Sequence, residues 1–114
     1  MGYQRRNPQV SAAITANAAR PATALIHDSA DARVVVFRIE PGQQVPIHTS
    51  VSTVLLIAIS GAGVVAGVVA GATGDRDVRA GDIIAYDVNE PHGMRANKEP
   101  LVIAAVIAPR PAAH

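Results

Sequence analysis

Short apolar runs alternate with turn-forming residues along the chain, and no stretch shows a convincing helical pattern. The clearest run, residues 33–40, places Val35, Phe37 and Ile39 on one face of an extended chain, because side chains alternate along a strand. We therefore predict a strand there with at least one buried face.

Residues 53–60 are almost continuously apolar, which is typical of a strand covered on both sides by a second sheet or subunit. Residues 61–74, rich in Gly, Ala and Val, are interpreted as strand, loop and strand, with glycines that allow sharp bends and close backbone contact. Polar residues 75–82 follow and end in a turn. Further apolar runs predict strands at residues 22–27, 45–50, 83–88, 92–96 and 101–108.

This succession of short strands and turns predicts an all-β antiparallel sandwich or barrel. A chain of 114 residues is large enough for one apolar core and too short for two ordinary ones. We expect an N-terminal arm at residues 1–20, which is mobile or embraces a partner. A single barrel domain is expected at residues 21–111 and a short tail at residues 112–114.

A membrane-spanning helix is the strongest competing interpretation of the middle of the chain. No charged residue lies between Glu40 and Asp75, and the apolar run from Val51 is long enough to cross a bilayer. Its β-branched residues, the Gly/Ser break at residues 60–63 and the absence of aromatic or basic flanks argue against a helix. We therefore expect no membrane partner.

Composition narrows the possible functions. The net charge of +1 and the aromatic content of 3% provide neither the basic stripe nor the stacking residues of a nucleic-acid binder. The chain has no cysteine, so any metal ion must be held by nitrogen and oxygen ligands. Residues 1–20 lack the apolar core of a secretory signal, and we expect a cytoplasmic protein.

Each of two histidines stands next to a turn, where a predicted strand begins. His48 follows the Pro41-Gly42 turn, and His92 follows the turn-like residues 87–91. Two strands this far apart in sequence can bring their imidazoles together only if the sheet curls round on itself.

The spacing around His48 resembles the first motif of the cupin superfamily. That motif reads glycine, five residues, His-x-His, three or four residues, glutamate, six residues and glycine. Here the corresponding positions are Gly42, His48, Ser50, Val54 and Gly61. The spacing is kept throughout, whereas the second histidine and the glutamate are replaced.

The spacing around His92 resembles the second cupin motif, which reads glycine, five residues, Pro-x-Gly, two residues, histidine, three residues and asparagine. Here the corresponding positions are Gly81, Asp87, Asn89, His92 and Ala96. Asn89 is a tolerable substitute for the glycine because asparagine enters the left-handed backbone region more readily than most residues.

The resemblance covers roughly residues 34–108 and implies a cupin jelly-roll barrel, a double-stranded β-helix of antiparallel strands. Metal cupins hold their ion with three histidines and a glutamate. By this resemblance His48 and His92 are the remaining metal ligands, while Ser50 and Val54 replace the other two. The resemblance thus implies a weakly held divalent transition metal (Zn, Ni, Cu or Fe) or none, with Glu90 and His27 as candidates to complete the site.

Four residues near the motifs are candidate ligand-binding groups. Each also has a purely structural interpretation, which is a backbone-bonded hydroxyl, core packing or a surface ion pair. The candidates are Ser50, Tyr86, Met94 and Arg95.

Cupins include oxygenases, isomerases, binding proteins and sensors, so the fold alone selects no activity. The first hypothesis is a module in which His48 and His92 orient a small-molecule ligand or a metal ion. The alternative is a metal-dependent oxygenase or isomerase that acts on a small organic substrate, and a third is a purely structural dimer. Because the uncharged middle of the chain exceeds what one small barrel buries, we expect a homodimer formed through sheet faces or an exchanged N-terminal arm.

Overall fold

The computed structural model describes residues 14–69 and 72–111, which form strands, turns and no helix. The strands are β1 (Ala22–Asp28), β2 (Arg33–Ile39), β3 (Gln44–His48), β4 (Thr53–Ser60), β5 (Ala62–Val69), β6 (Ala72–Arg79), β7 (Ile83–Tyr86), β8 (His92–Ala96) and β9 (Leu101–Ala108). The predicted all-β class is confirmed.

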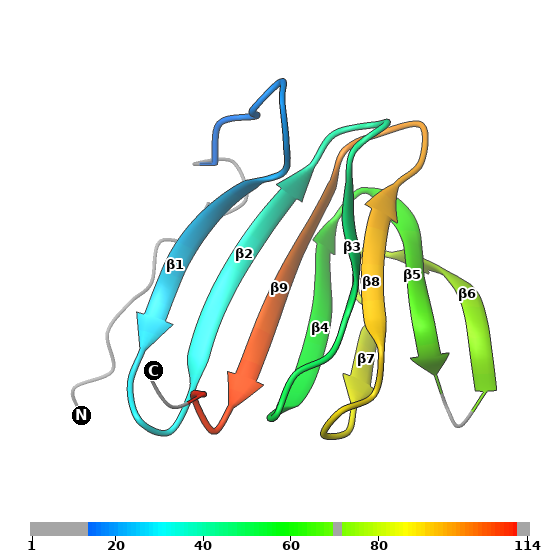
Figure 1. Cartoon of the computed structure of the whole chain (residues 1–114). Coiled ribbons are helices and arrows are strands. Elements are labelled where there is room, and N and C mark those ends of the chain that lie inside the picture. Colours follow the sequence, from blue (N-terminus) through cyan, green and yellow to red (C-terminus); the bar gives the residue numbers. More distant parts are fainter. Residues whose placement is uncertain (1–13, 70–71, 112–114) are drawn as a thin grey trace.

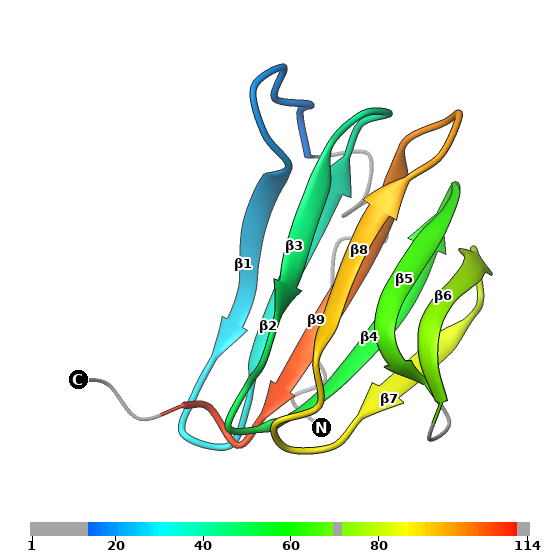
Figure 2. The same ribbon diagram turned by 45° about the vertical axis from the view of Figure 1, so that its right-hand side comes forward.

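The strands form two antiparallel sheets that face each other (Figures 1 and 2). The five-stranded sheet has the order β1-β2-β9-β4-β7, and the four-stranded sheet has the order β3-β8-β5-β6. Strands distant in sequence are therefore neighbours in space. In particular, β3 and β8, which carry the two histidines, lie side by side.

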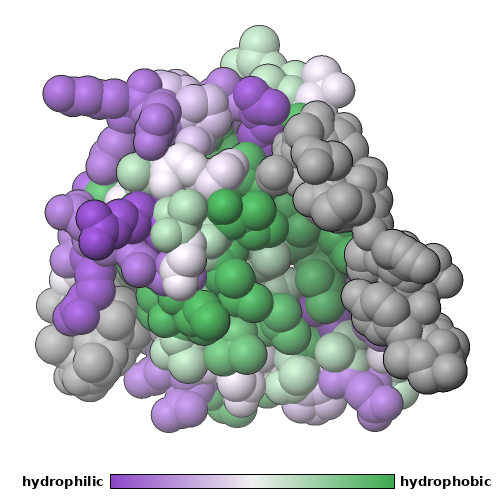
Figure 3. Space-filling view, turned by 180° about the vertical axis from the view of Figure 1, so that it is seen from behind, coloured by the Kyte–Doolittle hydropathy of each residue, from purple (hydrophilic) through white to green (hydrophobic). Residues whose placement is uncertain are grey.

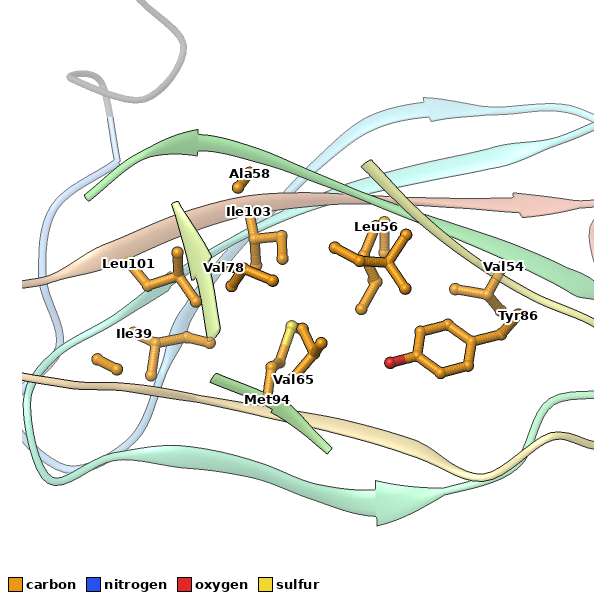
Figure 4. Close-up of a cluster of buried hydrophobic side chains, with 13 residues drawn as sticks. Ile39, Val54, Leu56, Ala58, Val65, Val78, Tyr86, Met94, Leu101 and Ile103 are labelled. Atoms are coloured by element: carbon orange, nitrogen blue, oxygen red, sulfur yellow. The ribbon is translucent and has the colours of Figure 1, made fainter. Parts of the chain in front are cut away.

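The space between the sheets is filled by aliphatic side chains, because one face of each strand points inward. Residues at alternate positions of β4 and β9 are almost fully buried, as Leu56 and Ile103 illustrate (Figure 4). The buried cluster consists of Ile39, Val54, Leu56, Ala58, Val65, Val78, Ile84, Tyr86, Met94, Ala96, Leu101, Ile103 and Ala105. These residues form the main apolar core, which lies between the two sheets.

The outer face of the five-stranded sheet carries a second, smaller apolar cluster. Ile14 packs there against Val36, Val102 and Ala104, all of them buried. Arg38 fixes this segment by donating a hydrogen bond of 3.2 Å from Nη1 to the Ile14 carbonyl. Part of the expected N-terminal arm, from residue 14 onward, thus covers a sheet face, and residues 1–13 lie outside the described residues.

The uncharged middle of the chain forms strands β4 and β5, so the competing interpretation as a membrane-spanning helix is wrong. Within the described ranges, no helix has the length and apolar character needed to cross a bilayer. The inner face of β4 is buried as predicted, whereas Ile59, at the bulge near the end of the strand, remains 39% exposed.

Three strand boundaries differ from the sequence prediction. The polar residues 75–79 belong to β6, an edge strand whose outward charges face water. Strand β7 ends at Tyr86, two residues early, and β3 ends at His48. Both of these strands end where the turns of the histidine segments begin.

Candidate functional site

His48 and His92 lie opposite each other on neighbouring strands, as the curled-sheet prediction requires. Their Cα atoms are partners in the β3–β8 ladder, and their ring centroids are 4.3 Å apart with planes inclined by 58°. The ladder shifts register between Val45 and His48, which re-aims the end of β3. Two imidazoles distant in sequence therefore meet at one point.

Each imidazole is held by a backbone carbonyl two residues earlier. Nδ1 of His48 lies 2.9 Å from the Pro46 oxygen, and Nδ1 of His92 lies 3.0 Å from the Glu90 oxygen. A carbonyl oxygen only accepts hydrogen bonds, so both Nδ1 atoms carry the proton. In the neutral rings both Nε2 atoms consequently keep a free lone pair, the form in which histidine binds metals.

The two turns that position the histidines are joined to each other. Asn89 donates a backbone hydrogen bond of 2.7 Å to the Ser50 carbonyl. Asn89 has φ = 65°, the left-handed conformation predicted for this position. The Glu90 carboxylate accepts a hydrogen bond of 2.6 Å from the Asp87 amide, so this side chain closes its own turn.

Burial distinguishes the two imidazoles. The His92 side chain is buried, whereas the His48 side chain is exposed. Burial lowers the pKa of His92 below its usual value, and the neighbouring His48 lowers it further, against the opposing effect of the Glu90 carbonyl. The Tyr86 ring lies beside His92 with a centroid separation of 5.0 Å, and burial raises the pKa of Tyr86. His92 is therefore neutral, and available as a donor of electron pairs, over a wider pH range than an exposed histidine.

A pocket of about 200 Å³ opens between the sheets beside the two histidines. Apart from the histidines and two hydroxyl groups its walls are apolar. The lining residues are Phe37, His48, Thr49, Ser50, Val54, Leu56, His92, Met94, Ala105, Ile107 and Pro111. Larger surface hollows, such as one of about 490 Å³ bordered by Arg76 and Ile83, contain no histidine.

The structure brings some of the predicted site residues to this pocket and leaves others away from it. Ser50 and Met94 line it, and Val54 occupies the position that corresponds to the cupin glutamate. Tyr86 lies behind His92 and does not line the pocket. Arg95 points to the outside of the four-stranded sheet, where it forms a 2.9 Å ion pair with Asp75. Arg95 is thus not brought to the histidine pair.

Neither candidate for an additional ligand reaches the histidine pair. His27 is exposed on β1, where its Nε2 lies 3.0 Å from the Ser29 hydroxyl. Glu90 is engaged in its turn, as described above. Within residues 14–69 and 72–111, no three His, Asp or Glu side chains lie together in a group that could hold a metal ion. His48 and His92 therefore offer two nitrogen ligands, without a carboxylate.

Sequence reasoning did not identify six of the residues that line the pocket: Thr49, which directly follows His48, and five residues of other segments. The alternation in residues 33–40 and 101–108 indicates which side chains point inward, but not that the two strands share one cavity. That information lies in the β2–β9 and β4–β9 ladders. The five residues of other segments are Phe37, Leu56, Ala105, Ile107 and Pro111.

Comparison with known proteins gives a structural likeness but no sequence-based assignment. No family model matches the chain, and no curated protein matches it. A protein with a double-stranded β-helix domain from Klebsiella pneumoniae aligns with a TM-score of 0.80 and 24% identity, over 96% of this chain and 95% of that one. An RmlC-like cupin from Desulfovibrio desulfuricans aligns with a TM-score of 0.77 and 21% identity, over 94% and 98% of the two chains.

A cupin superfamily protein from Desulfitobacterium hafniense aligns equally well, with a TM-score of 0.78 and 15% identity over 93% of each chain. These alignments span almost the whole chain and include both sheets. Together with the ladder that pairs the two histidine segments, they confirm the resemblance drawn from the motifs. The chain has the cupin fold, a double-stranded β-helix.

Proposed function

We propose that this protein is a binding module that holds a divalent transition metal ion at His48 and His92 and a small organic molecule in the adjoining pocket. The observation that carries the proposal is the pair of converging imidazoles whose Nδ1 atoms are both bound to backbone carbonyls. This arrangement fixes the tautomer and leaves both Nε2 atoms free, as expected of histidine ligands.

The donor set limits which ions fit. Two neutral imidazoles suit copper, nickel and zinc, whereas magnesium, calcium and manganese prefer carboxylate and carbonyl oxygens. Val54 provides no oxygen at the position of the cupin glutamate, which makes iron the weakest of the four candidate metals. The Met94 thioether in the same pocket is a soft group and favours copper further. A bound ion would act as a Lewis acid with open coordination positions.

The pocket selects its organic ligand by size and polarity. Its volume of about 200 Å³ is below the roughly 300–1,000 Å³ that hold drug-sized ligands, so the occupant is smaller than these. The aliphatic walls favour an apolar body, and the Ser50 hydroxyl and the imidazoles can bind one polar group. No carboxylate lines the pocket, so we place binding ahead of the alternative, oxygenase or isomerase chemistry.

A metal titration tests the proposal directly. Protein purified without chelators or nickel columns would be titrated with Cu²⁺, Ni²⁺, Zn²⁺ and Mn²⁺ while amide NMR signals are followed. We expect one equivalent of zinc to shift the signals of β3 and β8, one equivalent of copper or nickel to broaden or shift them, and manganese to bind most weakly. His48→Ala and His92→Ala should each weaken binding by roughly tenfold or more, the scale of losses seen at metal sites.

The matched control is His27→Ala, which removes an exposed histidine that is distant from the pair. This variant should bind metal as the unchanged protein does. Equal affinity in all four proteins, or the absence of any metal-induced shift or broadening at β3 and β8, would overturn the proposal.

A further inference from the structure

Charged residues are scarce in the five-stranded sheet, so the positions of the few that it has are informative. Strands β4, β7 and β9 contain none, and strands β1 and β2 contribute Asp28, Arg33 and Arg38. Viewed from behind, hydrophobic side chains gather in the middle of the molecule and hydrophilic ones along its margins (Figure 3). Arg38 is held by Glu40 at 2.8 Å and by the Ile14 carbonyl. Arg33 lies at the opposite end of β2 and contacts Asp28.

Arg33 and Arg110 converge on one carboxylate. Nε of Arg33 and Nη1 of Arg110 each lie 3.4 Å from the same oxygen, Oδ1 of Asp28. Asp31, in the same hairpin, forms no ion pair among the described residues. Each guanidinium group also keeps most of its N–H donors free of acceptors on other described residues. We call Arg33 and Arg110 the arginine pair, which carries one positive charge beyond the one that Asp28 neutralises.

The arginine pair borders the pocket beside the two histidines. Arg33 is the ladder partner of Ile107, which lines the pocket, and it shares the inward face of β2 with Phe37, another lining residue. Arg110 directly precedes Pro111, which lines the pocket as well. The β1–β2 hairpin, the end of β9 and the end of β3 meet at the same end of the barrel (Figures 1 and 2). A molecule that fills the pocket against Ile107 therefore has one end beside two guanidinium groups.

Charge is distributed unevenly around the pocket. Asp87 and Glu90 follow β7, at the edge of the five-stranded sheet that is opposite to β1 and the arginine pair. Glu90 keeps its carboxylate in the turn by accepting the hydrogen bond from the Asp87 amide. An anionic ligand is therefore repelled on the β7 side and attracted on the β1 side, which gives it one preferred orientation.

We propose that the organic ligand of the pocket is a small apolar monocarboxylic acid whose carboxylate binds the arginine pair. Guanidinium groups match the planar geometry of a carboxylate and bind it with paired hydrogen bonds. The single excess positive charge favours a monoanion over a phosphate or a dicarboxylate. A cavity of roughly 150 Å³ accommodates benzene, so one of about 200 Å³ holds a body of about six carbons. The proposal rests on the organic-ligand part of the proposed function and is independent of the metal ion.

Titration of metal-free protein with two matched probes tests the ligand class. Hexanoate and hexanamide have the same length and differ in charge, and the titration is run at pH 8, where an ordinary imidazole is uncharged. We expect both probes to shift the NMR methyl signals of Leu56 and Ile107, which line the pocket. Hexanoate should bind roughly tenfold more tightly than hexanamide, because hydrogen bonds to a charged group contribute more than neutral ones.

Variants of the charged residues test where the carboxylate binds. Arg33→Gln and Arg110→Gln should each weaken hexanoate binding severalfold and leave hexanamide binding unchanged. Asp28→Asn should strengthen hexanoate binding, because it removes the competing carboxylate. The matched control is Arg95→Gln, which should change neither affinity. Arg95 also pairs with an aspartate and its side chain is similarly exposed, at 43% against 40% for Arg33, but it lies on the outside of the four-stranded sheet. Circular dichroism should show the same fold in all variants.

The possible outcomes separate this inference from the proposed function. Equal affinity for the two probes would overturn the inference, while the organic-ligand part of the proposed function stands. Unchanged hexanoate affinity in both Arg33→Gln and Arg110→Gln, or weaker hexanoate binding by Asp28→Asn, would also overturn the inference. The absence of a shift with either probe would overturn both the inference and the organic-ligand part, and the metal titration remains a separate test of the histidine pair.

Discussion

The hydroxyl of Tyr86 should destabilise the fold, and its removal should therefore stabilise the protein. The Tyr86 side chain is fully buried, with an exposed fraction of 0%. Its hydroxyl points toward the middle of the core cluster (Figure 4) and has no hydrogen-bond partner among the described residues. Tyr86→Phe keeps the ring beside His92 and deletes only the unpaired group.

The magnitude follows from two opposing terms. A buried donor without a partner costs about 1–3 kcal/mol, which the substitution recovers. The vacated volume, on the order of 10 Å³, costs about 0.2 kcal/mol at roughly 24 cal/mol per Å³. We expect Tyr86→Phe to raise the free energy of unfolding by about 1–2 kcal/mol. For a domain of this size that corresponds to a rise in Tm of about 4–8 °C.

Urea denaturation followed by far-ultraviolet circular dichroism measures this change. The midpoint should rise while the slope stays constant, which indicates a change in stability without a change in the surface exposed on unfolding. The difference in tyrosinate absorbance between the two proteins should place the ionisation of Tyr86 above pH 10, because burial raises its pKa. A loss of 1 kcal/mol or more in Tyr86→Phe would refute the reasoning, since it would mean that the hydroxyl has a favourable partner.

Three further predictions concern the turns, strands and titrating groups around the site. Gly67 has φ = 114°, and a Cβ there would lie 2.0 Å from the Pro91 oxygen. In urea denaturation Gly67→Ala should therefore lower the free energy of unfolding more than Gly74→Ala does, because a Cβ at Gly74 meets nothing within 4 Å. Asn89→Val should lower stability in the same assay by about 1–2 kcal/mol, because a β-branched residue resists the left-handed region, while Asn89→Gly should not. The pKa of His92 is lower in the folded protein than in the unfolded chain. Below about pH 6.5 the unfolded chain therefore binds more protons than the folded protein does. The free energy of unfolding should therefore decline as the pH falls through that value, and His92→Gln should make this decline smaller. The same dependence of stability on pH in both proteins would contradict this prediction.

The sequence was sufficient to predict that the two histidine segments meet, because the spacing of each motif specifies a turn followed by a strand. The conformation of Asn89 was predicted for the same reason, since few residues adopt a positive φ. The close backbone contact expected of the glycines is found at Gly67, the ladder partner of His92. Each of these predictions rests on local backbone geometry, which a sequence encodes directly.

What the sequence prediction missed depended on which face or edge a residue occupies. Met94 lies two residues after His92 and shares its inward face, whereas Arg95 lies three residues after and points outward. Strand alternation could have separated these two candidates. It could not have shown that Phe37 and Ala105 line the same pocket, because that depends on strand order. The charged residues of β6 led to the prediction of a polar segment in place of a strand. An edge strand tolerates outward charges that an interior strand does not.

The pocket and the outer face of the five-stranded sheet are two sides of the same strands. In β4 Leu56 lines the pocket while Leu55 and Ile57 lie on the outer face, and β9 alternates in the same way. A one-residue shift in either strand would exchange the two sets of side chains, so the register that forms one surface also forms the other. Leu56 is buried in the interior, and Leu55 and Ile57 lie half-buried on the outer face, so β4 carries apolar side chains on both faces. Apolar residues on both faces give the strand the unbroken apolar pattern that also permits the interpretation as a membrane helix.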